Sequence, residues 1–403
     1  MNLLSGNLTT VDPLVSALGT INKSISFFAA FSLIGVFLAL SFFLIEREGK
    51  LEAHALQLRN VGRVLAGIWF LTSAFQIVIT VANILGTSLT EALNTTTLKS
   101  FVTQIELGKY LGFQTLVGGV VLISINFIRG TLSSTVLLLA SLVALVAPVF
   151  QSHSAASGSH SLAIGSLAIH VIALSLWVGG IFALILINEA DRRVALPRFS
   201  QLALWAAIAV VGSGIANAWA RMNFASAWST SYARIVIAKT VLTIVLLVLA
   251  YRNRKSLQAG DRTGWKLLSR IIVVEAFIMG VTLVLGSWLS ATQPPEGKEV
   301  PFSAALSIVG YPTPEAPNLV RLLTLYDPDA LIIGLLITLV ALYIKGVVIL
   351  KKRGDSWPVG RTIAFALAIS AMDFATSGGL GVYAKFSFEY HMIAHMVIGM
   401  LVP

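Results

Sequence analysis

Long apolar segments dominate this chain of 403 residues and limit what it can fold into. An α-helix needs ~20 apolar residues to cross a ~30 Å hydrocarbon core. Eleven segments approach or exceed that length, at about 24–45, 62–85, 111–128, 131–150, 162–187, 201–219, 234–251, 269–291, 329–350, 361–381 and 386–403. Only 11% of the residues are charged, against roughly 25% in soluble domains, and the apolar pattern lacks the alternation of a membrane β-barrel. The sequence predicts an all-α polytopic membrane protein with about eleven transmembrane helices.

Lysine and arginine residues are divided unequally between the two sets of loops. The loops after the first, third, fifth, seventh and ninth spans hold 18 of them, and the opposite loops hold 8. Cytoplasmic loops of membrane proteins are enriched in Lys and Arg, so the N-terminus is predicted to lie outside. The same bias explains the net charge of +10 without a nucleic-acid partner.

Five of the six histidines fall in the outer half of the protein under this orientation. His153 and His160 lie in an outer loop, and His170 follows ~15 Å deeper in an apolar helix, where a polar side chain is costly without a partner or a metal. His391 and His395 lie at the outer end of the last span. Because the chain has no cysteine, a soft-metal site in it must use histidine and methionine.

The segment His391-Met-Ile-Ala-His395-Met places two imidazoles at positions i and i+4 on one helix face, a natural bidentate arrangement for a metal. Met392 and Met396 follow with the same spacing on a neighbouring face. Imidazole and thioether ligands without thiolate favour copper. Imidazoles in membrane helices also ligate haem b, so both copper and haem remain open as cofactors.

Three ionisable residues lie inside predicted spans, where a charge costs at least ~2.5–3.5 kcal/mol. They are Glu275, Asp373 and Lys239. Lys239 is the expected partner of Glu275, although it can also extend toward the membrane surface. A structural ion pair and a role in ion translocation are both open. Trp177, Trp219, Trp228 and Trp288 fall near span ends, where an aromatic belt is expected.

The sequence divides into four regions. Residues 1–150 form an N-terminal four-helix membrane region, and 151–295 form a second four-helix bundle. Residues 296–328 are rich in proline and are expected to form an external linker, and 329–403 form a last helical region. Within the first region, 86–110 is expected to hold an amphipathic interfacial helix.

Two sets of motifs resemble known families. The first set is His170-x6-Trp177-Val-Gly-Gly180, Arg198-Phe-Ser200, Ser213-Gly214, Tyr232 to Lys239, and Glu275 followed by Pro294-Pro295. This set resembles the CopD family of bacterial copper-resistance and copper-uptake membrane proteins. The second set is Trp357-Pro358, Gly378 to Tyr383 and His391-Met-x2-His395-Met; it resembles the start of the CtaG-type cytochrome c oxidase assembly factors. Their order is similar to that of the CopD–CtaG fusion proteins of actinobacteria. The resemblance implies copper handling at the outer face of the cytoplasmic membrane, and His170, His391 and His395 fall on family-type histidine positions.

The leading hypothesis is a non-enzymatic copper permease or metallochaperone in the cytoplasmic membrane. His153 and His160 capture copper, His170 holds it deeper, and His391–Met396 provides a second or transfer site. Copper then passes to cytochrome c oxidase subunits or a respiratory supercomplex. The alternatives are a membrane oxidoreductase that binds haem b and a structural subunit of a respiratory complex. No nucleophile elbow, phosphate-binding loop, dinucleotide fingerprint or HExxH motif is present, so the sequence does not indicate an enzyme.

Overall fold

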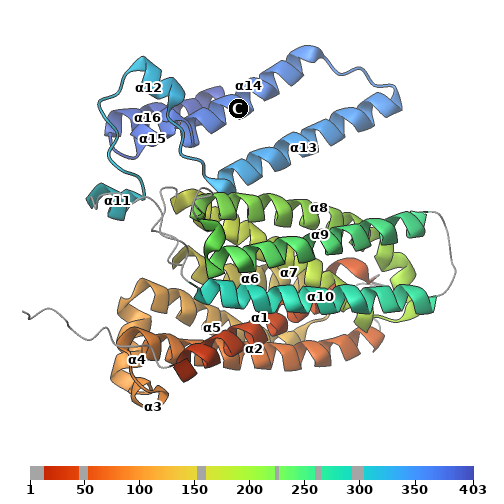
Figure 1. The fold of residues 1–403 in the computed structure, drawn as a ribbon. Coiled ribbons are helices and arrows are strands. Elements are labelled where there is room, and N and C mark those ends of the chain that lie inside the picture. The colour runs from red at the N-terminus through yellow and green to blue at the C-terminus, as the bar shows by residue number, and fades with distance from the viewer. Residues whose placement is uncertain (1–12, 45–52, 152–159, 223–226, 259–264, 293–303) are drawn as a thin grey trace, which may run out of the picture. The chain divides into compact units, whose positions relative to one another are not determined.

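The computed structural model describes the chain outside residues 1–12, 45–52, 152–159, 223–226, 259–264 and 293–303 (Figure 1). Its α-helices are α1 (Pro13–Leu38), α2 (Ala53–Leu85), α3 (Leu89–Ala92), α4 (Thr95–Gln104), α5 (Glu106–Ser124), α6 (Thr131–Val146), α7 (His160–Leu186), α8 (Glu189–Arg221), α9 (Ser231–Gln258), α10 (Trp265–Ala291), α11 (Ala304–Val309), α12 (Leu319–Thr324), α13 (Ala330–Arg353), α14 (Val359–Thr376), α15 (Gly379–Ala384) and α16 (Phe388–Met396). Short 3₁₀ or π turns follow several of them: η1 (Ala39–Phe43), η2 (Ile125–Phe127), η3 (Ala147–Gln151), η5 (Ala227–Ser229) and η6 (Val397–Leu401). Within the described residues, the only β pairing is an isolated bridge between Tyr326 and Gly378.

Ten helices in the described part of the chain are long and apolar enough to cross a membrane. They coincide with the first ten expected spans, which confirms an all-α polytopic membrane protein. The eleventh expected span, 386–403, is helical from Phe388 to Leu401, where the last turn is a π turn.

The chain divides into two compact units. Unit 1 comprises 1–151, 171–211 and 224–295, and unit 2 comprises 152–170, 212–223 and 296–403. Helices α7 and α8 are therefore each divided between the two units. The part of each helix toward the predicted cytoplasmic side belongs to unit 1, and the part toward the predicted outer side belongs to unit 2.

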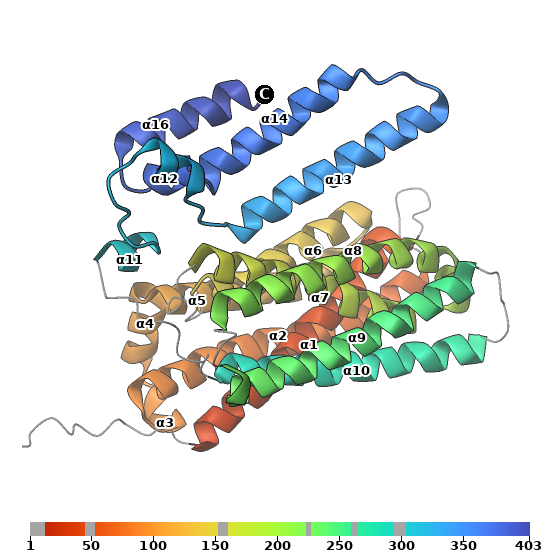
Figure 2. The same ribbon diagram turned by 45° about the horizontal axis from the view of Figure 1, so that its top comes forward.

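Unit 1 is a helical bundle arranged around α1. Every residue from Ala29 to Leu40 is buried, as expected for a helix that is apolar all round. Helices α2, α6 and α10 pack against α1, and α1 and α2 run side by side (Figures 1 and 2). Helix α7 approaches α1 closely at Gly179, where an added Cβ would lie 2.5 Å from the carbonyl oxygen of Phe31. Small residues allow such backbone approaches between membrane helices.

The expected amphipathic helix in 86–110 is present as α4. Asn94 caps it by accepting hydrogen bonds from the backbone N–H groups of Thr96 and Thr97. Its apolar face contacts other helices of the protein, because Phe101 is buried in a cluster that includes Ile79 of α2. The helix is therefore packed onto the bundle of unit 1.

Unit 2 contains the hairpin of α13 and α14 together with the shorter helices α15 and α16 (Figure 2). Asp329 caps the start of α13, and Gly354, with φ of +85°, ends it in the left-handed conformation. The region expected to be a linker, 296–328, is folded where it is described: it holds α11 and α12, and α12 packs against α15.

Candidate functional site

His170 lies on the outer part of α7 and is half-buried. Its Nδ1 atom is 3.1 Å from the hydroxyl oxygen of Ser213 on α8, which is buried. Gly214 lies beside the ring, because a Cβ there would be in van der Waals contact with His170, at 3.6 Å from Cε1.

A second polar layer lies one helical turn from the first on both helices. Asn217 donates to the Ser166 hydroxyl oxygen at 3.2 Å and to the carbonyl oxygen of Ala163 at 3.1 Å. Ser166 is fully buried. Because Ser166 and Asn217 are each four residues from His170 and Ser213, the two layers form a polar ladder between α7 and α8. Polar side chains in a membrane are expected to pair across helices in this way.

His391 and His395 form a direct pair on α16. Their Nε2 atoms are 3.1 Å apart, and their ring centroids are 4.6 Å apart in a T-shaped arrangement. A hydrogen bond between two Nε2 atoms needs one of them protonated and the other free to accept. The pair therefore converges on one point, as the i, i+4 spacing predicts, and both side chains are exposed.

The methionines of this segment are exposed rather than packed into a core. Met392, Met396 and Met400 are 44%, 54% and 72% exposed, respectively. Ala394 is buried, in a cluster with Ala375 and Leu380. The helix therefore packs through Ala394 and presents its histidines and methionines outward. A π turn follows at Val397–Leu401, a local distortion that is common at functional sites.

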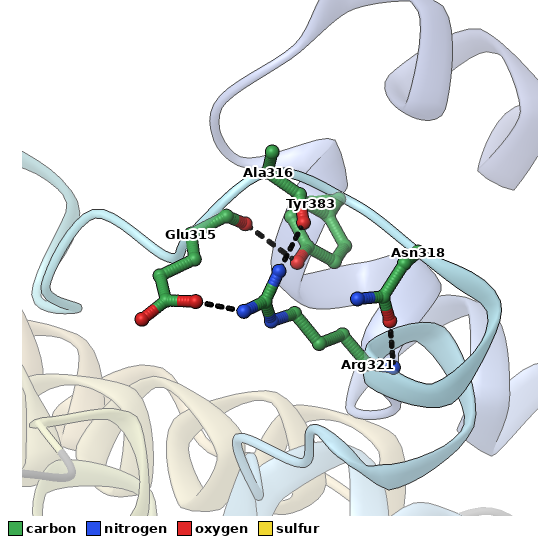
Figure 3. A network of polar contacts seen from close by, with 5 residues as sticks. All are labelled: Glu315, Ala316, Asn318, Arg321 and Tyr383. Atoms are coloured by element: carbon green, nitrogen blue, oxygen red, sulfur yellow. Dashed lines mark hydrogen bonds and ion pairs between the residues drawn. The ribbon is translucent and has the colours of Figure 1, made fainter.

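A hydrogen-bonded segment holds α15, and through it α16 (Figure 3). The Tyr383 hydroxyl donates to the carbonyl oxygen of Glu315 at 2.8 Å, and the Tyr383 ring lies 5.5 Å from that of Tyr390 on α16. Arg321 pairs with the Glu315 carboxylate and donates to the carbonyl oxygen of Ala316. This network thus connects the segment before α12 to the residue that precedes His391.

Asp373 lies near this network. The Tyr326 hydroxyl donates to its Oδ1 atom at 3.1 Å. Burial raises the pKa of Tyr326, and the hydrogen bond to Asp373 and the carboxylate charge raise it further. Close by in the chain, Lys385 pairs with buried Asp327 at 2.6 Å. The Asp373 carboxylate thus accepts a hydrogen bond from a neighbouring tyrosine.

The predicted ion pair of Lys239 with Glu275 is not formed. The Nζ atom of Lys239 lies beside Gly286, at 3.4 Å from the position of an added Cβ. Gly286 follows Glu275 by eleven residues on α10, or roughly 16 Å of helix. The register of α9 against α10 therefore separates the two charges, and Glu275 is buried at another level, with 7% of its surface exposed.

Several motif residues serve the fold. Trp177 is 3% exposed in the core of unit 1, so its assignment to an aromatic belt was wrong. Trp219, Trp228 and Trp288 are more than half exposed, as a belt requires. Gly180 packs against the ring of Phe199. Arg198 donates to the carbonyl oxygen of Phe42 at 2.8 Å, near the end of η1.

The histidines in the part of the chain that the structure describes do not gather into one site. Within the described residues, no group of three or more His, Asp or Glu side chains lies close enough to hold a metal ion. His391 and His395 form one pair, and His170 lies with Ser213. His153 and the side chain of His160 lie outside the described residues. Sequence reasoning missed Ser166 and Asn217, because their roles depend on which helices become neighbours.

These features define a multi-pass membrane protein with a polar ladder between two of its helices and an exposed histidine pair on a third. Three family models match the chain: the copper resistance protein D-like N-terminal domain at 17–163, copper resistance protein D (CopD) at 193–289, and the cytochrome c oxidase caa3 assembly factor (Caa3_CtaG) at 341–403. The chain matches a CopD–CtaG fusion, as its motifs predicted.

Curated relatives match the chain over different shares of its length. The uncharacterised protein Mb0105 of Mycobacterium bovis is 24% identical over 89% of this chain and 53% of its own length. Copper transport protein CutJ of Bacillus subtilis is 29% identical over 39% of this chain and 30% of its own length. Inner membrane protein YebZ of Escherichia coli is 30% identical over 31% of this chain and 47% of its own length. The chain spans about half the length of the mycobacterial relative, and no solved structure matches it.

Proposed function

We propose that the chain binds copper as a cargo and moves or delivers it at the outer face of the cytoplasmic membrane, without catalysing a reaction. The observation that carries this proposal is the His391–His395 pair, with Nε2 atoms 3.1 Å apart. Imidazole nitrogens and thioethers are the ligands that copper accepts when no thiolate is present. The match of 341–403 to an oxidase assembly factor supports an oxidase as the recipient.

The polar ladder at His170 is the second part of the proposal. His170 holds copper deeper in the protein, with Ser213 orienting its ring through Nδ1. A hydrogen bond to one ring nitrogen fixes the direction in which the other nitrogen is presented to a metal. His153 and His160 precede His170 in the sequence and serve, on this proposal, to capture copper first.

The geometry of the pair favours copper over a haem shared by its two imidazoles. A bis-histidine haem requires one imidazole on each side of the porphyrin. His391 and His395 project from successive turns of one helix, with their Nε2 atoms 3.1 Å apart, which leaves no space for a macrocycle between them.

Metal content and the absorption spectrum of the purified full chain test the proposal. The protein is loaded with Cu(I) under reducing conditions, separated from free metal by gel filtration, and analysed for copper and haem. We expect copper to remain bound in near-stoichiometric amounts without a Soret band. A stoichiometric Soret band together with no retained copper would support the haem-binding oxidoreductase instead.

Crowding the His170 ring is expected to weaken copper binding. In Gly214→Leu the new side chain occupies the space beside the imidazole, whereas a Cβ at Gly212 meets nothing within 4 Å. Disturbing residues that orient a ligand typically weakens metal binding by about 10–100-fold. We expect a loss of this size for one copper ion in Gly214→Leu and none in Gly212→Leu, measured by competition with a Cu(I) chelator. Equal affinities in the two variants would remove His170 from the proposed site.

A further inference from the structure

The turn between α13 and α14 concentrates positive charge. Lys351, Lys352 and Arg353 form the last turn of α13, and Arg361 lies in the first turn of α14. All four are exposed. Asp355 is the only acidic residue between Lys351 and Arg361, and the ion pairs found in the described part of the chain involve none of these four cations.

An aromatic group fixes one of these cations in place. The Arg361 guanidinium lies over the Trp357 ring, 5.1 Å from its centroid. Trp357 in turn donates from Nε1 to the Tyr343 hydroxyl at 2.8 Å, and Tyr343 stacks on Phe365 with ring centroids 4.0 Å apart. Because stacking on an aromatic face leaves the N–H groups of a guanidinium available, Arg361 is oriented without being neutralised.

The position of this group relates it to a membrane. It lies at one end of two helices that are each long and apolar enough to cross the bilayer. Trp and Tyr side chains collect at the depth of the lipid headgroups. On the α13 side of the turn, Ile344, Val348 and Ile349 are exposed, so apolar surface for acyl chains adjoins the charged surface for a headgroup.

We propose that the surface formed by Lys351, Lys352, Arg353, Trp357 and Arg361 binds the phosphate headgroup of an anionic phospholipid. Clusters of four or more Lys and Arg next to a transmembrane helix attract anionic lipids. Arg361 supplies the planar donor set that matches phosphate oxygens. A soluble phosphate compound would gain nothing from the adjoining apolar helix surface, whereas a phospholipid uses both. This inference is independent of copper binding.

Lipid selectivity of the full chain tests the proposal. The protein is reconstituted in phosphatidylcholine nanodiscs containing phosphatidylglycerol, and the lipids that remain bound after mild extraction are counted by native mass spectrometry. The test variant is Lys351→Gln/Lys352→Gln/Arg353→Gln. The matched control, Arg129→Gln/Arg252→Gln/Lys255→Gln, removes three exposed cations elsewhere on the side predicted to be cytoplasmic. We expect at least about a fivefold enrichment of bound phosphatidylglycerol in the wild type and the control, and its loss in the test variant. Equal enrichment in all three proteins, or equal loss in test and control, would overturn the proposal.

Fluorescence quenching gives a second readout in a chain with all its charges intact. Brominated phosphatidylglycerol is expected to quench the wild type more than brominated phosphatidylcholine does, and Trp357→Phe is expected to remove this excess while keeping an aromatic ring at the position. Glycerol phosphate at the same concentration should not reduce the excess. An excess that persists unchanged in Trp357→Phe, or that glycerol phosphate abolishes, would overturn the proposal.

Discussion

Replacing Gly179 with alanine is expected to destabilise the helical bundle of unit 1 severely. The added Cβ would lie 2.5 Å from the carbonyl oxygen of Phe31 and 2.8 Å from the backbone nitrogen of Gly35. Both atoms belong to the backbone of α1, so no rotamer change can relieve the overlap. Helix α1 is buried on all sides along this stretch, and therefore α1 and α7 must move apart and lose contacts elsewhere. Overpacking typically costs about 1–3 kcal/mol, and we expect a value at or above the upper end.

Thermal unfolding of the detergent-solubilised protein measures this effect. Gly280→Ala on α10 is the matched control, because a Cβ there meets nothing within 4 Å and alanine is favoured over glycine in a helix by roughly 1 kcal/mol. We expect Tm to fall by several degrees in Gly179→Ala and to stay the same or rise in Gly280→Ala. The same Tm in both variants would contradict the close packing of α1 on α7.

The membrane architecture was predictable because it depends on local sequence. The length and apolarity of a segment decide whether it can span a bilayer, and ten expected spans were found as helices. The spacing of His391 and His395 likewise predicted their pairing, since i and i+4 positions always meet on a helix. The segment 386–403 is likewise helical, from Phe388 to Leu401.

The remaining features depend on which helices become neighbours and in what register. Gly179 looked like part of a local motif, yet its role is set by α1, which lies far away in the sequence. Trp177 does not lie at a membrane surface, because α7 passes through the core of unit 1. The pairing of Lys239 with Glu275 failed for the same reason: residues on antiparallel helices meet only in the correct register. Sequence alone also offered no reason to select Asn217, whose partners come from α7.

The exposed pair of His391 and His395 is the central part of the proposed copper site. If copper binds there, removing both imidazoles deletes two of its ligands and leaves only thioethers, which alone provide a weaker set for the metal. The variant His391→Ala/His395→Ala should keep its fold, because both side chains are exposed and α16 packs through Ala394. Glu389→Gln, on the same helix and also exposed, is the matched control.

The most direct test is the copper stoichiometry of these two variants beside that of the wild type. Each purified full-length chain is titrated with Cu(I) in competition with a chelator, after gel filtration has shown that it is monodisperse. We expect the copper content to fall by about one ion per chain in His391→Ala/His395→Ala and to be unchanged in Glu389→Gln. The same copper content and affinity in the histidine variant as in the wild type would contradict the assignment of copper to this pair.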